Sequence, residues 1–251
     1  MAERIGIYHA YPHEGDFDTP LGPPTCWRPS VALGHVAAPT TPRPLWGRYL
    51  ELGAAALAAG LTGIRLTPEW ARLAERPGRY LNEVVESYRR EINALVNSGL
   101  TVHVAVIDDV WPSFLGAEGW LWPWAHDALV DHVGALVEML GDEVASWDIA
   151  PQFDDIIHRG FMTGQHPPFR TSANRDAQEV RDMWRQTLSE CDRVVTRTSL
   201  PTVPVTARTA DVVAAMASHG PVAIDALLSD TTRDGLCSLT PDGVSVRQLL
   251  A

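Results

Sequence analysis

The sequence predicts an α/β fold, a single compact domain similar to a TIM (β/α)8 barrel. Both a complete and an incomplete barrel are compatible with this prediction. Apolar runs of strand length alternate with amphipathic runs of helix length, which is typical of parallel strands covered by helices. The chain has 251 residues, and a barrel of this kind needs about 250. We therefore expect one domain over residues 1–251.

The elements expected from these patterns come in alternating order. Strands are predicted at residues 4–10, 62–67, 101–107 and 144–150, and helices at 44–60, 82–99, 124–140 and 174–197. Asn82 is the expected N-cap of its helix, and residues 11–44 are expected to form a long loop. Further strands at 202–206 and 222–225, with a helix between them, and a hairpin at 235–246 are expected next. Only 101 residues follow residue 150, which leaves little chain for the four further strand and helix units of an eight-stranded barrel.

The composition restricts the partners that we expect. A net charge of −11 argues against nucleic acid and anionic membranes, and no apolar run reaches the roughly 20 residues that span a bilayer. The first residues lack a secretory signal, and the three cysteines lack metal-ligand spacing, as in a reduced cytoplasmic protein. We expect a small-molecule substrate, and the composition is compatible with either a monomer or a homodimer.

The basic residues restrict the chemistry. All 20 are arginine, so a lysine Schiff base and attachment of pyridoxal phosphate are excluded. We therefore expect no cofactor. We also expect no metal, because the cluster of His9, His13 and Glu14, which could bind one with Asp108, lacks a third histidine. A composition rich in arginine, alanine and proline indicates a bacterial source with high GC content.

The predicted site is built around the stretch 146–155. This stretch starts as an apolar strand, breaks at Pro151 and ends in a polar loop with two aspartates, while two more close the strand 101–107. Chemistry in a β/α barrel takes place where strands end and loops begin. Burial and like-charge repulsion there would give an acid and a base, unless the aspartates only cap helices or fix loops. The predicted catalytic residues are Asp108, Asp109, Asp154 and Asp155.

Other side chains near the predicted strand ends are candidates for substrate binding. Arg65 lies inside an apolar strand, where it would bind a carbonyl or anionic group, orient an aspartate or form a structural salt bridge. Tryptophans within 111–124 would form either an aromatic wall or core, and His158 and His166 would be acid–base groups or solvated loop residues. The predicted binding residues are His9, Glu14, Arg65, Trp111, Gln152, His158 and Asp225.

Several short motifs, taken in their order along the chain, carry a resemblance to a known family. They occupy residues 10–15, 22–27, 64–70, 109–112, 119–121 and 141–144, followed by Trp147. They resemble motifs of family 1 glycoside hydrolases, the β-glucosidase-like enzymes, among them Ala-Tyr-Gln-x-Glu-Gly and Tyr-Arg-Phe-Ser-x-x-Trp. The resemblance covers roughly residues 5–170 and implies a TIM-barrel scaffold.

The same resemblance implies that the family's catalytic residues have been lost. The family motif Trp-x-Thr-x-Asn-Glu-Pro carries the acid/base glutamate, but Pro151 stands here at the Asn position and Gln152 at the Glu position. The nearest counterpart of the family's nucleophile is Ala207. A retaining glycosidase needs two carboxyl groups about 5–5.5 Å apart. Retaining glycosidase activity is therefore not implied.

Three functions follow as hypotheses. The first is a glycosidase-derived enzyme of bacterial specialised metabolism that uses Asp/His general acid–base catalysis on a small aromatic or sugar-like molecule. Cyclisation, dehydration, isomerisation or hydrolysis would fit. The second is an inactive glycosidase-like protein that binds a small molecule or scaffolds a partner. The third is an atypical inverting glycoside hydrolase that pairs Asp108 or Asp109 with Asp154 or Asp155.

Overall fold

Four parallel strands form the centre of the molecule. A computed structural model describes residues 4–8, 11, 14–37, 45–197 and 236–237. Its main sheet has the order β6-β5-β2-β1-β7, in which only β7 runs antiparallel to its neighbour. Within the described residues the sheet is open and does not close into a barrel. Its strands are β1 (Ile5–Tyr8), β2 (Gly63–Leu66), β5 (Thr101–Ala105), β6 (Ser146–Asp148) and β7 (Leu236–Cys237).

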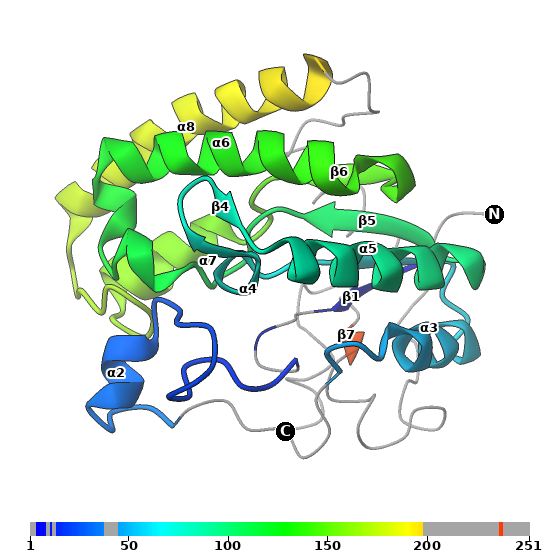
Figure 1. Ribbon diagram of the computed structural model, residues 1–251. Helices are drawn as coiled ribbons and strands as arrows, with labels where there is room; N and C mark the ends of the chain where they lie inside the picture. Colours follow the sequence, from blue (N-terminus) through cyan, green and yellow to red (C-terminus); the bar gives the residue numbers. More distant parts are fainter. Residues whose placement is uncertain (1–3, 9–10, 12–13, 38–44, 198–235, 238–251) are drawn as a thin grey trace.

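Long helices connect the parallel strands and cover the sheet on its outer side (Figure 1). Helix α8 lies along α6, and α5 packs between α3 and α6. The predicted alternation of strands and helices is confirmed for four units. The helices are α3 (Tyr49–Ala58), α5 (Asn82–Asn97), α6 (Pro123–Leu140) and α8 (Asn174–Arg197).

Apolar periodicity explains why these helices face the sheet. Helix α5 buries Val85, Tyr88, Ile92 and Leu95, which lie three or four residues apart and therefore share one face. Burying a large apolar side chain contributes about 1.5–3 kcal/mol. The strands β1 and β2 are buried along their whole length, as expected for a parallel sheet.

Several local expectations are corrected by the structure. Asn82 is the first residue of α5, and Leu81 precedes it as the N-cap residue, so Asn82 does not cap the helix. The predicted long loop contains the short helix α2 (Arg28–Ala32). The predicted polar loop after β6 is helical, because α7 (Phe153–Ile157) starts there with its two aspartates in the favourable first turn.

Smaller elements complete the described part of the chain. A π-helix, η4 (His158–Met162), continues α7. An unpredicted hairpin follows β2, and Gly78, with a φ of 72°, allows its tight turn. The hairpin consists of β3 (Ala74–Arg76) and β4 (Arg79–Tyr80), and the short helix α4 (Trp70–Leu73) precedes it. Single 3-10 turns are η1 (Ser113–Leu115), η2 (Gly119–Leu121) and η3 (Gly141–Glu143).

Some predicted elements lie outside the described residues. These are the strands at 202–206 and 222–225, the helix between them and most of the hairpin at 235–246, of which only β7 is described. Among the described helices, none combines the length and the apolar character that crossing a bilayer requires.

Candidate active site

The carboxyl ends of β2, β5 and β6 meet at one edge of the sheet, because these strands are parallel neighbours. The ladder between β5 and β6 continues past the strands, since Ile107 donates its backbone N–H to the Ile149 carbonyl at 3.1 Å. Asp108 and Asp109 follow directly, and Gln152 lies where the chain leaves β6. The edge predicted to carry the site therefore does gather these residues.

Asp109 is held by an arginine from the π-helix. The Nη2 atom of Arg159 lies 3.6 Å from Asp109 Oδ2 and forms a second ion pair with Asp155. Asp108 is buried, whereas the side chains of Asp109 and Arg159 are about one-third exposed. Two predicted catalytic residues, Asp109 and Asp155, are thus joined through one guanidinium group that the sequence had not singled out.

His166 lies beside this pair, since the charges of both Asp109 and Arg159 act on its ring. It is only 1% exposed, and its ring lies 4.7 Å from Trp27 and 5.5 Å from Trp111 between ring centroids. Burial lowers the pKa of His166, while the Asp109 carboxylate partly offsets this and Arg159 adds to it. His166 is therefore a buried neighbour of Asp109 and not a solvated loop histidine. The adjacent π-helix is of a kind often found at functional sites.

Glu69 adds a third carboxyl-bearing loop from the end of β2. It is 3% exposed, and its Oε1 accepts the backbone N–H of Tyr11 at 3.1 Å. Burial raises the pKa of Glu69 well above its usual range, and the charges of Glu14, Asp108 and Asp109 raise it further. The available sequence signal was its position just after a strand, the same signal that identified Asp108.

A polar layer lies beneath this edge of the sheet. Arg65 of β2, His103 of β5 and Ser146 of β6 are in register, so their side chains project from the same face. Arg65 Nη1 donates to Asp148 Oδ2 at 3.2 Å, and each side chain is 6% exposed. His103 Nδ1 lies 2.5 Å from Ser146 Oγ. Arg65 thus forms the salt bridge that was one of its predicted roles, with a partner that the sequence had not suggested.

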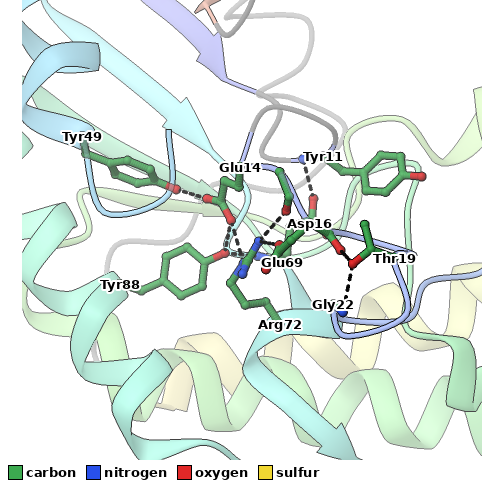
Figure 2. Close-up of polar contacts among 10 residues, drawn as sticks. Tyr11, Glu14, Asp16, Thr19, Gly22, Tyr49, Glu69, Arg72 and Tyr88 are labelled. Atoms are coloured by element: carbon green, nitrogen blue, oxygen red, sulfur yellow. Dashed lines mark hydrogen bonds and ion pairs between the residues drawn. The ribbon is translucent and has the colours of Figure 1, made fainter. Parts of the chain in front are cut away.

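Glu14 is the centre of a buried network that Tyr88 links to the backbone of Glu69 (Figure 2). Its carboxylate accepts hydrogen bonds from the Tyr49 hydroxyl, from the Tyr88 hydroxyl at 2.9 Å and from Arg72 Nε at 3.2 Å. Burial raises the pKa of Glu14, and the charge of Arg72 opposes that rise. Both carboxylate oxygens are engaged by the protein, so Glu14 anchors the segment after β1 to α3, α4 and α5.

The other predicted residues are spread over different environments. Trp111 is fully buried, and its Nε1 donates to the Gly116 carbonyl at 2.8 Å, as in a core residue. The Asp154 side chain is 92% exposed and lies 3.9 Å from Arg181 of α8. His158 is exposed at the start of the π-helix, and Gln152 is half-buried at the N-cap of α7. His9, His13 and Asp225 lie outside the described residues.

Metal-ligating side chains are not gathered into a site in the described part of the chain. There, no group of three or more histidine, cysteine, aspartate or glutamate side chains has the arrangement of a metal site. The carboxyl and imidazole groups gathered at this edge are of the kinds that transfer protons, and Arg159 places a positive charge beside them.

Comparison with known proteins supports the fold. No family model and no curated protein sequence matches the chain. Solved structures do match. The AHE enzyme from Alicyclobacillus herbarius is 20% identical, with a TM-score of 0.70, over 80% of this chain and 47% of that one. A β-glucosidase from Thermotoga maritima in complex with deoxynojirimycin is 20% identical, with a TM-score of 0.68, over 79% and 46%.

A β-glycosidase from Thermosphaera aggregans is 16% identical, with a TM-score of 0.67, over 80% of this chain and 53% of that one. The chain spans about half of the length of these neighbours. Identities this low establish the fold alone. The resemblance to the family 1 glycoside hydrolase scaffold is therefore confirmed as a resemblance of fold: the described residues form a TIM-barrel-like α/β sheet that is open and partial.

Proposed function

We propose that the chain is an enzyme that uses general acid–base catalysis on a small molecule bound where β2, β5 and β6 end. The observation that carries this proposal is the placement of Asp109 at the end of β5, beside buried His166 and within ion-pair distance of Arg159. A carboxylate, an imidazole and a fixed positive charge form a set that can accept a proton, return it and stabilise developing negative charge.

The substrate class follows from the surroundings of this set. Trp27 packs against His166 and against the partly exposed ring of Phe169, so an apolar or ring-shaped group would find aromatic surface there. The solved neighbours include a β-glucosidase, a β-glycosidase and an aphid myrosinase. A small aromatic or sugar-like molecule therefore fits best, in a cyclisation, dehydration, isomerisation or hydrolysis.

The occupant of the family's acid/base position separates this proposal from retaining glycosidase chemistry. Gln152 stands there, and an amide cannot donate or accept a proton near neutral pH as a carboxyl group does. No covalent glycosyl-enzyme is expected. Incubation with a fluorinated-sugar inactivator should leave the mass of the protein unchanged, and a stoichiometric adduct would contradict this part of the proposal.

The direct test replaces the base. A defined library of glycosides and small aromatic compounds would be screened for turnover by mass spectrometry with the wild-type chain. Asp109→Asn should then lower turnover by about 10²–10⁴-fold, the usual contribution of general acid–base catalysis. Asp182→Asn, on the exposed surface of α8, is the matched control and should keep wild-type turnover. Equal turnover of both variants would refute the proposal.

A second candidate function is binding without catalysis. It is favoured by the fact that Asp109 and Asp155 are both in ion pairs with Arg159, which orders the site without leaving these carboxylates to act. Binding without turnover by the wild-type chain, measured calorimetrically with library compounds, would support this alternative.

A further inference from the structure

Glu69 is the buried carboxyl group of this edge to which the proposed function gives no role. The chain places it directly after β2, as the N-cap residue of the short helix α4. Its side chain makes no capping hydrogen bond, although capping is the usual structural reason for a polar residue at that position. It is 3% exposed, and its carboxylate turns instead to the segment after β1, where it accepts the backbone N–H of Tyr11.

The backbone around Glu69 is fixed from two sides (Figure 2). Its own N–H donates to the Tyr88 hydroxyl oxygen at 3.0 Å, and the Tyr88 hydroxyl donates in turn to Glu14 at 2.9 Å. The backbone N–H of Tyr11 donates to Glu69 Oε1. The carboxyl group is thus held in one place at the end of β2, which is the requirement for a group that must meet a substrate in a fixed geometry.

The charges around Glu69 are mostly negative. Within the described part of the chain it forms no ion pair with a cation, and Arg72, the arginine of the same network, is engaged by Glu14 and Asp16. The charge of Glu69 in turn helps to raise the pKa values of the buried phenols of Tyr8 and Tyr88. Burial, together with Glu14, Asp108 and Asp109, raises the pKa of Glu69 well above the usual value for glutamate.

We propose that Glu69 is a catalytic residue, the proton donor that works opposite Asp109 on a substrate bound between the ends of β2 and β5. This inference rests on the proposed function, in which Asp109 is the base. Asp109 takes a proton as a bond to hydrogen in the substrate breaks, and Glu69 gives its carboxyl proton to a substrate oxygen. One proton enters the enzyme and one leaves it, so no oxidant, reductant or cofactor is needed, and exchange with water restores both groups.

The first experiment needs no substrate. The protein would be labelled with 13C at the glutamate side-chain carboxyl carbons and titrated by NMR. One resonance should titrate well above the ordinary glutamate range, and Glu69→Gln should remove it. Asp109→Asn should lower the titration midpoint of that resonance, because it removes a neighbouring negative charge. Asp155→Asn is the matched control, since it removes a charge on the same arginine that does not act on Glu69.

A Glu69 resonance that titrates in the ordinary glutamate range would overturn the inference. Glu69→Asp serves for the assignment if the glutamine variant does not fold, because it keeps a carboxyl group and removes only the labelled glutamate signal. Circular dichroism and thermal melting would establish that each variant is folded before it is titrated.

The second experiment measures turnover of the compound found by the library screen. Glu69→Gln should lower turnover by about 10²–10⁴-fold and abolish the decline of activity at high pH, because a donor must be protonated to act. A loss of turnover in Asp109→Asn with none in Glu69→Gln would overturn this inference and leave the proposed function standing. Wild-type turnover in both variants would overturn both.

Discussion

The buried pair between Arg65 and Asp148 can be tested quantitatively. The two side chains are each 6% exposed and lie 3.2 Å apart across β5. Asp148→Asn keeps the shape of the side chain and removes its charge, which leaves the guanidinium of Arg65 buried without a countercharge. Breaking a buried pair on one side costs about 3–5 kcal/mol. We therefore expect the free energy of unfolding to fall by about 3 kcal/mol.

Urea-induced unfolding measures this loss. With a urea dependence of about 1–3 kcal/mol per molar, the unfolding midpoint should fall by about 1–3 M. The control is Asp182→Asn, which removes one partner of the exposed pair between Asp182 and Arg185 at 2.6 Å. An exposed pair contributes about 0–1 kcal/mol, so the control midpoint should change little.

A double replacement completes the cycle. Arg65→Met and Asp148→Leu would be made singly and together, and the double variant, which removes both charges, should be markedly more stable than the sum of these two single changes predicts. A cost below 1 kcal/mol for Asp148→Asn, equal to that of the surface control, would refute the reasoning. It would mean that water reaches the pair and that the polar layer under the site is not sealed.

Three further predictions concern buried ionisable groups. The free energy of unfolding of the wild type should fall as pH rises from the ordinary glutamate value of 4.5 towards the raised pKa of Glu69, because only the folded state still holds that proton. Chemical unfolding at several pH values should show a weaker pH dependence in Glu69→Gln, and an unchanged pH dependence would contradict this prediction. Burial lowers the pKa of His132, which stacks on Trp70, from 6.5 to about 3, so stability should be lost as pH falls below 6.5, and thermal melting should find less of this loss in His132→Phe. Glu14→Ala should leave the hydroxyl hydrogen of buried Tyr88 without its acceptor at a cost of about 1–3 kcal/mol, with further loss at Arg72, and a melting temperature equal to that of wild type would contradict the anchoring role.

The parts of the fold that sequence could predict are those set by local periodicity. The helix expected at 174–197 is found as α8 (Asn174–Arg197), because its apolar residues recur on one face without help from distant segments. The four parallel strands were located for a similar reason, since a strand buried on both faces is a short continuous apolar run. Their ends were less accurate: the strand expected at 144–150 is only Ser146–Asp148.

The site was harder to predict because burial there depends on residues far apart in the chain. The position of Asp109 at a strand end could be read from sequence, but its partner Arg159 could not, since the helical turn that presents it was expected to be a loop. His166 is buried by Trp27, which lies in a distant segment, so nothing next to it in sequence indicates burial. Asp148 was counted only as part of a strand, although it is the partner of Arg65.

The ion pairs of this protein have a consequence for its behaviour in alkaline solution. The cation in each pair described above is an arginine, and a guanidinium keeps its proton at every pH at which proteins are handled. A lysine pair, by contrast, would lose its charge near pH 10.4, the usual lysine pKa. The buried phenol of Tyr49 and the thiol of Cys26 have pKa values raised by burial, so stability should fall once the pH exceeds their ordinary values of 10.0 and 9.0, at which these groups ionise in the unfolded chain. Base thus removes none of the cations in these pairs, and alkaline unfolding should be driven by the ionisation of buried acidic groups while the salt bridges keep their charges.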